Sequence, residues 1–375
     1  MTAALVLVLV VVLVALVFEY INGFHDTANS IATVVATKVL TPVQAVALAA
    51  VMNLIGALMG TAVALTISSG LIDSDVVLVS SQLMICALSG GIVWNLITWW
   101  FGLPSSSSHA LIGGLVGAAL AAADNNFDVL IWAREAEHWT GNEGIFWKVV
   151  VPMVSSPLAG FTLGLVMMGA LLAVISAMNG AGGWLARISR PRWVNAVFGK
   201  AQIVSAAYMG YAHGTNDAQK TMGIIALALI GAEAAGTLDS LPPMLAFLHP
   251  GSAEGGIDTW IIITCAIVMA AGTAAGGWRI IKTLGHKVVK LHPIHGFAAE
   301  TSSATILSLA AHFGMPVSTT HSISTAIMGV GVAKNPRALR WSIIQKIIWA
   351  WILTIPAAGG LAYALYKGAQ WVGWT

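Results

Sequence analysis

Apolar residues run through most of the chain in long stretches, which short polar segments separate. Residues 3–18 carry no charge, and the stretches at 43–67 and 261–276 are interrupted only by small or polar residues. A helix of about 18 or more apolar residues can cross the hydrocarbon core of a bilayer, which is roughly 30 Å thick. The pattern therefore predicts an all-α polytopic membrane protein with roughly ten to twelve membrane segments, several of them broken.

Composition supports this prediction. Of 375 residues, 58% are hydrophobic and 9% are charged, whereas soluble domains carry about a quarter charged residues. The first apolar stretch has no Lys or Arg before Lys38 and no small-residue cleavage site, so we expect a retained helix rather than a signal peptide. Cys86 and Cys265 both lie in apolar stretches, and they are too few for a disulfide framework or a structural metal site.

Charged residues sort into different loops, which predicts how the chain is inserted. Basic residues gather in short loops, at Arg187, Arg190, Arg192 and Lys200, at Arg279, Lys282, Lys287 and Lys290, and at Lys334, Arg337, Arg340 and Lys346. Acidic residues fill the loops between them, at Asp73 and Asp75, at Asp124, Asp128, Glu135, Glu137 and Glu143, and at Glu233, Asp239, Glu254 and Asp258. The positive-inside rule makes the basic loops cytoplasmic and places both termini outside.

Two motifs occur twice, in the same order. Residues 23–29 (Gly-Phe-His-Asp-Thr-Ala-Asn) resemble 214–220 (Gly-Thr-Asn-Asp-Ala-Gln-Lys), and 101–109 (Phe-Gly-Leu-Pro-Ser-Ser-Ser-Ser-His) resemble 313–321 (Phe-Gly-Met-Pro-Val-Ser-Thr-Thr-His). Such recurrence indicates duplication. Because the first copy is expected to begin outside and the second inside, the repeats are inverted, as in several secondary transporters. We expect a first repeat at 1–175, a short basic cytoplasmic linker at 176–200 and a second repeat at 201–375.

The Ser/Thr clusters suit anion binding. Each precedes a short apolar run, at 110–123 or 322–333, that fits half of a re-entrant hairpin. Ser, Thr and Pro favour helix starts, where free N–H groups, hydroxyls and the positive end of the helix dipole would face an anion. Alternatively, the hydroxyls only bond packed helices together. His109 and His321, which end the clusters, could orient the hydroxyls or titrate.

Asp26 and Asp217 interrupt apolar segments. Their Gly and Asn neighbours predict an unwound helix whose carbonyls line a cavity. A carboxylate at membrane depth can hold a cation or carry a proton, or it can be a structural acid paired with Lys220.

Other polar residues of the apolar segments are further candidates. His25 lies within the first copy and His213 directly precedes the second, so either could contact the cavity. Glu300 could contact substrate, or it could lie at the cytoplasmic boundary. The sequence leaves the role of Glu19 open in the same way.

These motifs resemble the signatures of the inorganic phosphate transporter (Pit) family, most closely its bacterial low-affinity members. The resemblance covers nearly the whole chain, without the long central loop of eukaryotic members. It implies an inverted-repeat fold with broken helices and two re-entrant hairpins, a homodimer in the bacterial inner membrane, and import of inorganic phosphate by cation symport. Divalent cations such as Mg²⁺ would be co-substrates, carried as a metal–phosphate complex.

The resemblance also implies roles for single residues. It assigns phosphate binding to the two clusters, at Ser106, Ser107, Ser108, Ser318, Thr319 and Thr320. It assigns the coupling cation to the Asp motifs, at Asp26, Asn29, Asn216 and Asp217, with Lys220 beside them.

One position departs from the family pattern. Sodium-coupled relatives carry Asn in both copies where this chain has Asn29 and Lys220, and they tend to carry Glu at the position of Asn53. A fixed ammonium can take the place of a sodium ion or titrate against Asp217. We therefore hypothesise proton coupling, with H⁺ rather than Na⁺ as the transported cation.

Other functions stay open. A sulfate permease or a sodium-coupled phosphate symporter would use the same fold, and an anion channel is a further alternative. An intramembrane hydrolase is disfavoured, because one catalytic centre has no use for two inverted copies of a Ser/His pair. We expect no enzyme activity, no resident cofactor and no nucleic-acid partner.

Overall fold

The computed structural model describes residues 2–69, 71–73, 76–77, 79–135, 142–239, 241–250 and 256–374. Asp75, Glu137 and Glu254, predicted in acidic loops, lie outside them. The described chain is helical and contains no named strand, which confirms the predicted fold class. Its α-helices are α1 (Ala3–Ala36), α2 (Pro42–Ala57), α3 (Ala62–Ser69), α4 (Ser81–Phe101), α5 (Ser107–Ala122), α6 (Val151–Gly180), α7 (Gly183–Ile188), α8 (Pro191–Ala234), α9 (Thr259–Ala275), α10 (Trp278–Lys282), α11 (Pro293–His312), α12 (Thr319–Lys334) and α13 (Trp341–Trp371).

Several of these helices can cross a membrane. By length and composition, four described spans qualify: α1, α4, α13 and the helix over Phe146–Gly180, which includes α6. Two further spans are broken, with a bend of 68° between α2 and α3 and of 57° between α9 and the helix that begins with α10. With α8, α11 and the half-length α5 and α12 added, the described segments agree with a polytopic architecture of broken helices.

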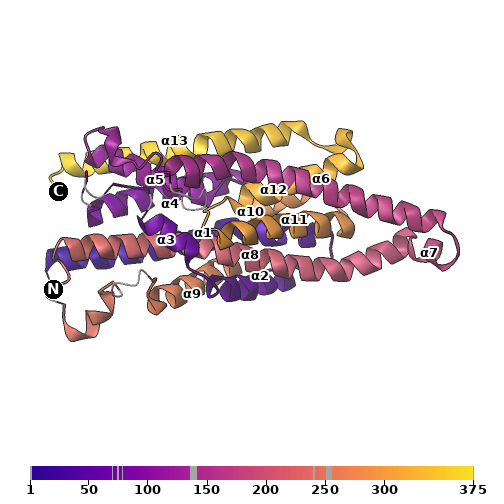
Figure 1. The fold of residues 1–375 in the computed structure, drawn as a ribbon, viewed down its shortest axis with the longest axis horizontal. Helices are drawn as coiled ribbons and strands as arrows, with labels where there is room; N and C mark the ends of the chain where they lie inside the picture. Colours follow the sequence, from indigo (N-terminus) through magenta and orange to yellow (C-terminus); the bar gives the residue numbers. More distant parts are fainter. Residues whose placement is uncertain are drawn as a thin grey trace.

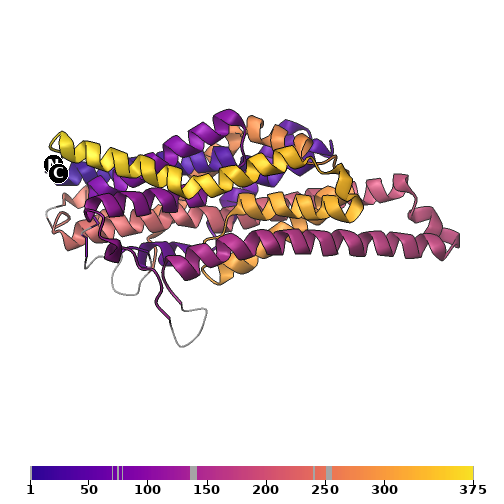
Figure 2. The same ribbon diagram turned by 90° about the horizontal axis from the view of Figure 1, so that it is seen from above.

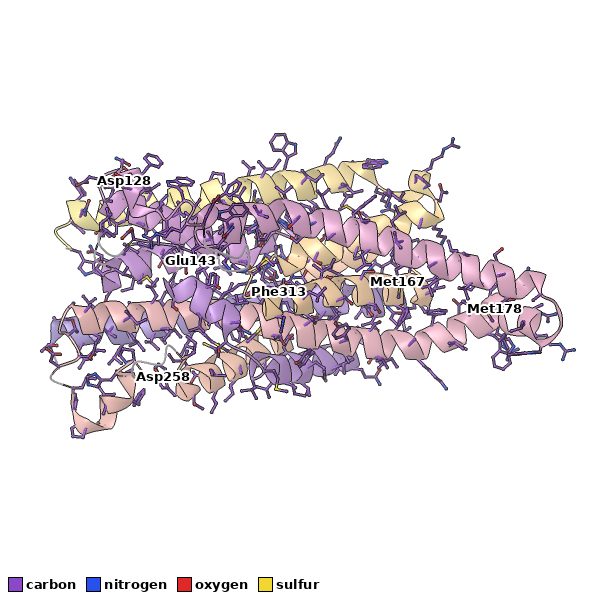
Figure 3. All side chains as sticks on the ribbon, viewed as in Figure 1. Asp128, Glu143, Met167, Met178, Asp258 and Phe313 are labelled. Atoms are coloured by element: carbon purple, nitrogen blue, oxygen red, sulfur yellow. The ribbon has the colours of Figure 1, made fainter. Side chains whose placement is uncertain are left out.

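The helices lie along one long axis, and both termini lie at the same end (Figure 1). The same arrangement is visible after a quarter turn, where α6 and α8 extend together to the opposite end (Figure 2). Asp128, Glu143 and Asp258 lie in the half that holds the termini, whereas Met178 lies near the far end (Figure 3). These acidic residues thus lie toward the opposite end from Met178, which belongs to the predicted basic linker at 176–200. The assignment of the acidic end to the outside stays a prediction.

Matched contacts relate the two motif copies. A Cβ atom on Gly56 of α2 would lie 2.1 Å from the carbonyl oxygen of Tyr211 in α8, and one on Gly272 of α9 would lie 2.1 Å from that of Tyr20 in α1. Likewise α5 packs on α13, and α12 packs on α6. Each half of the sequence therefore completes the packing of the other, so the predicted repeats interleave. The inverted duplication stays a prediction, which these matched contacts support.

Two hairpins enter the molecule from opposite ends. The first joins α4 to α5 and the second joins α11 to α12. Gly102 and Gly314 both have a φ of 62°, a left-handed conformation that glycine adopts without strain, and each ends the first helix of its hairpin. Figure 1 shows α5 running toward the end that holds the termini and α12 running away from it. The starts of these two helices face each other in the middle.

One local prediction is wrong: the helices are not unwound at the Asp motifs. Helix α1 continues through Asp26, and α8 continues through Asp217. The glycines of the motifs serve close packing instead. A Cβ atom on Gly23 would lie 2.3 Å from a carbonyl oxygen of α9, and one on Gly214 would lie 2.3 Å from a carbonyl oxygen of α2. The small residues let neighbouring backbones approach while the helical hydrogen bonds are kept.

Candidate functional site

The first hydroxyl of each Ser/Thr cluster caps a helix. Ser106 accepts a hydrogen bond from the backbone N–H of His109 at 3.2 Å, and Ser318 accepts one from that of His321 at 3.2 Å. Both serines are therefore N-caps, as the sequence predicted. We call residues 106–108 the first arm and residues 318–320 the second arm. The positive ends of two helix dipoles, α5 and α12, face the same central region.

The second hydroxyl of each arm donates a hydrogen bond to the aspartate of the same repeat. Ser107 Oγ donates to Asp26 Oδ2 at 2.7 Å, and it lies 2.7 Å from Asn22 Oδ1. Thr319 Oγ1 donates to Asp217 Oδ2 at 2.5 Å. All of these side chains are buried. The structure thus joins each predicted anion-binding arm directly to a predicted cation-binding aspartate.

The third hydroxyl of each arm crosses between repeats. Asn29 Nδ2 donates to Thr320 Oγ1 at 2.9 Å, and Lys220 Nζ donates to Ser108 Oγ at 2.5 Å. Lys220 also bonds to Asp217 and, at 2.9 Å, to a backbone carbonyl of the second hairpin. An ammonium has three protons, so these three contacts satisfy it. Asn29 and Lys220, at which the two copies of the Asp motif differ, therefore make equivalent contacts: each bonds to the third hydroxyl of the other repeat's arm.

The carboxylates and histidines form one centre. One ligand atom each of Asp26, His213 and Asp217 lies within 4.8 Å of the others. His25 Nδ1 lies 2.6 Å from Asp26 Oδ1. His213 Nε2 lies 3.0 Å from Asp217 Oδ2, close enough for an ion pair but not aligned as a hydrogen bond. Two carboxylates, two imidazoles and one ammonium thus meet in one buried centre.

Asn53 determines which nitrogen of His213 carries a proton. Its amide nitrogen donates to Thr273 Oγ1 at 2.8 Å, which leaves Oδ1 facing His213 Nδ1 at 3.0 Å. Since Oδ1 can only accept, Nδ1 is protonated. Nε2 then faces Asp217 either as a lone pair or as the second N–H of an imidazolium. A proton can be held between these two side chains.

Three further polar residues singled out in the sequence do not belong to this centre. Asn216 Nδ2 contacts the carbonyl oxygen of Met315 at 3.4 Å, so it supports the second hairpin. Glu300 accepts hydrogen bonds from Thr33, Ser205 and Gln202, in a separate buried cluster of α1, α8 and α11. Glu19 accepts from Thr221 and lies near Asn22. In the described chain, no hydrogen bond joins Glu300 to either arm.

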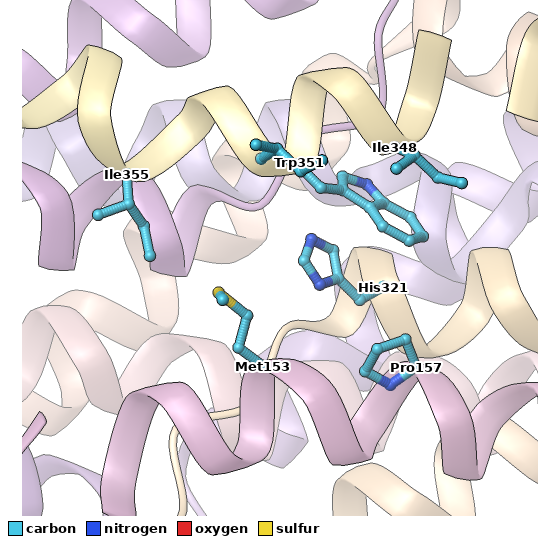
Figure 4. A pocket seen from close by; sticks show the side chains of 7 residues that line it. Met153, Pro157, His321, Ile348, Trp351 and Ile355 are labelled. Atoms are coloured by element: carbon cyan, nitrogen blue, oxygen red, sulfur yellow. The ribbon is translucent and has the colours of Figure 1, made fainter. Parts of the chain in front are cut away.

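His109 and His321 do not orient the hydroxyls of the arms. Their rings pack edge to face, with centroids 4.7 Å apart, and His321 also stacks on Trp351 at 4.1 Å. Within the described chain, neither ring nitrogen of His321 has a hydrogen-bond partner. His321 lines a cavity of about 330 Å³ between α6 and α13, with Met153, Pro157, Ile348, Ile352 and Ile355 (Figure 4). These contacts are those of packed side chains and not of groups that orient the hydroxyls of the arms.

Sequence reasoning missed some polar residues of the site. Asn22 directly precedes the first motif and contacts Ser107. Thr98 lies three residues before the second motif, 3.1 Å from His25 Nε2, and accepts a hydrogen bond from Ser105 at 2.8 Å. Both are polar residues in apolar stretches, and this pattern could have identified them as candidate site residues.

Comparison with known proteins shows the family of this chain. Residues 22–362 match the model of a family described as "Phosphate transporter family". The chain belongs to the phosphate transporter family. The match begins at Asn22 and includes both Asp motifs, both arms and both hairpins, so it covers every element of the site described above.

Individual relatives are similar over all or most of their lengths. Proteins named "Probable low-affinity inorganic phosphate transporter" include one from Mycobacterium tuberculosis (strain ATCC 25618 / H37Rv), 43% identical over 100% of this chain and 80% of that protein. Another, from Bacillus subtilis (strain 168), is 39% identical over 98% of each chain. A solved structure, "The sodium-dependent phosphate transporter", has a TM-score of 0.77 at 22% identity over 98% of this chain and 100% of that one, and shows the shared fold.

Proposed function

We propose that the protein imports inorganic phosphate as a secondary active symporter and that the coupling ion is a proton. The observation that carries this proposal is the pair of bonds from Ser107 to Asp26 and from Thr319 to Asp217. Family membership supports phosphate as the substrate, and the geometry of the site suggests how a cation would be coupled to it.

The coupling follows from the number of protons on a hydroxyl. A serine or threonine hydroxyl has one proton, so it donates to one acceptor at a time. While Asp26 and Asp217 are ionised, Ser107 and Thr319 donate to them and cannot donate to phosphate. A proton bound at either aspartate weakens that bond and frees the hydroxyl. Phosphate and proton therefore bind better together than separately, which is the requirement for symport.

Lys220 favours a proton over sodium. Its ammonium contacts Asp217, Ser108 and the second hairpin, so it fills the place where a sodium ion would need oxygen ligands. The remaining negative charge lies on Asp26 and Asp217, beside His25 and His213. Imidazoles bind protons readily near neutral pH, and they are poor ligands for sodium.

A divalent cation would arrive together with phosphate. Asp26, His213 and Asp217 have the ligand types and spacing for a metal, but Lys220 already neutralises one carboxylate. We propose that Mg²⁺ enters as a metal–phosphate complex, with phosphate oxygens completing its oxygen shell.

Phosphate is favoured over sulfate by the same carboxylates. At neutral pH, phosphate carries a proton that it can donate to an aspartate, whereas sulfate carries none and is repelled. The proposed setting is the bacterial inner membrane, and the proposed assembly is a homodimer.

The test is uptake of labelled phosphate into proteoliposomes that contain the purified protein under an inward proton gradient. We expect uptake that a tenfold excess of sulfate leaves unchanged and that removal of Mg²⁺ by a chelator lowers. Equal competition by sulfate would indicate a general oxyanion permease. Full uptake without divalent cations would remove the metal–phosphate part of the proposal only.

A further inference from the structure

The two hairpin tips occupy matching places, which makes a comparison residue by residue possible. We call residues 102–105 the first tip and residues 314–317 the second tip. A Cβ atom on Gly102 would lie 3.1 Å from the carbonyl oxygen of Arg279, and one on Gly314 would lie 3.0 Å from that of Ala62. Arg279 of α10 and Ala62 of α3 are therefore equivalent positions. Both follow the break in a bent helix.

Aromatic residues and Arg279 pack against one another beside the first tip. The guanidinium of Arg279 lies 4.2 Å from the ring centroid of Trp100 and 5.1 Å from that of Trp99. Its Nη1 donates to the carbonyl oxygen of Trp100 at 2.6 Å, and Thr283 donates to that of Gly102 at 2.8 Å. Phe24 packs on Trp99 at 4.9 Å. Cation–π contacts and hydrogen bonds thus hold this tip against α10.

A cavity occupies the matching space beside the second tip. The aligned motifs make Trp99 equivalent to Ala311, Trp100 to His312, and Phe24 to Thr215. These small or polar residues, with Ala62, line a cavity of about 280 Å³, together with Met59, Gly60, Tyr211, Gln219 and Ser308. The cavity exists because alanine and threonine stand where the other half of the molecule has tryptophan and phenylalanine.

The cavity lies next to the proposed transport site. Thr215 and Gln219 belong to the same helix as Asp217 and Lys220. The second tip lies along the same part of α8, where Asn216 and Lys220 donate to carbonyl oxygens of the tip. From the cavity, α3 leads toward the end that holds the termini (Figure 1). The cavity and the second tip therefore both border the part of α8 that holds Asp217.

We propose that this cavity is the vestibule through which phosphate, a hydrated oxyanion, reaches the site from the end that holds the termini. We further propose that Arg279, with Trp99 and Trp100, is the gate that closes the equivalent vestibule at the opposite end. The inference rests on the proposed transport function. A carrier must close one side while the other is open, and this structure has a cavity beside the second tip and packed aromatic residues with Arg279 beside the first.

Two equivalent positions provide the test. Thr215→Cys places a thiol in the vestibule and Phe24→Cys places one at the gate, in a background where the buried Cys86 and Cys265 are replaced by alanine. The reaction rate of each thiol with a charged, water-soluble thiol reagent is measured on detergent-solubilised protein, where both ends are accessible. We expect Thr215→Cys to react at least about tenfold faster than Phe24→Cys, because reaction requires an exposed thiol. Equal rates would overturn the proposal.

Arg279 is tested in the Phe24→Cys protein. Arg279→Ala is expected to raise the rate at Phe24→Cys at least about fivefold, and Arg279→Lys to raise it less, since lysine keeps the charge but loses planar stacking. Lys282→Ala, a charge loss on the same helix, is the matched control and is expected to change nothing. An unchanged rate in both Arg279 variants would overturn the gate. The labelling needs neither phosphate nor an ion gradient, so its outcome is separate from a failure of the proposed function.

Discussion

A single proton on each of two hydroxyls connects the proposed anion site to the proposed cation site. Ser107 and Thr319 donate to carboxylates, and in the proposed mechanism each can donate either to its carboxylate or to phosphate, but not to both. The sequence allowed the relevant residues to be predicted, because polar side chains stand out in apolar segments. It did not allow the pairs to be predicted. Asn29 and Thr320, for example, are separated by 291 residues, and no local pattern joins them.

Removal of these hydroxyls should weaken phosphate binding. We expect Ser107→Ala and Thr319→Ala each to raise the KM for phosphate about tenfold, because a hydrogen bond to a charged group contributes roughly 1.5–3 kcal/mol. Initial rates of uptake at varied phosphate concentrations measure the effect. Ser156→Ala is the control, since the buried Ser156 hydroxyl of α6 has no hydrogen-bond partner in the described chain. Unchanged KM values in both arm variants would argue against the paired-arm site.

At the scale of elements, the molecule depends on close approach between helices. The hairpins and the N-caps of α5 and α12 agree with their sequence signals, since Pro, Gly and Ser act through local backbone chemistry. The expected unwinding at Asp26 and Asp217 was wrong, because Gly and Asn permit either an unwound helix or a tightly packed one. Only the neighbouring helix, which lies far along the chain, decides between them.

A pair of glycine substitutions tests this packing. Gly23→Ala should destabilise the protein, because its Cβ atom would lie 2.3 Å from a backbone oxygen of α9 and force the helices apart. Gly169→Ala in α6 is the control: nothing lies within 4 Å of its Cβ position, and alanine favours a helix by up to about 1 kcal/mol. Thermal unfolding of the detergent-solubilised proteins should show a lower Tm for the first variant only. Equal Tm values would contradict the close contact.

At the scale of the whole molecule, charge separation along the axis sets the expected orientation. The alternation of acidic and basic loops was readable from the sequence. Figure 3 places the acidic residues Asp128, Glu143 and Asp258 toward the end with the termini, and Met178 of the predicted basic linker near the opposite end. The interleaving of the repeats was not readable, because motif order does not say which helices pack together. That interleaving also means that neither half has a complete site alone, since Asn29 and Lys220 each bond to the other half's arm.

Orientation can be measured directly. In intact cells, a membrane-impermeant thiol reagent should label Asp128→Cys and leave Met178→Cys unlabelled until the membrane is permeabilised. The reason is that Asp128 lies at the end with the termini and Met178 near the basic end (Figure 3), and basic loops stay in the cytoplasm. The reverse pattern would place the termini inside.

In the proposed mechanism, phosphate and a proton share one site, and Lys220 takes the place of a sodium ion. Accumulation of labelled phosphate in proteoliposomes, driven by one imposed gradient at a time at zero membrane potential, tests it most directly. We expect accumulation above equilibrium with an inward proton gradient, and its collapse when a protonophore is added. Accumulation driven by a sodium gradient alone, with equal pH on both sides, would contradict it.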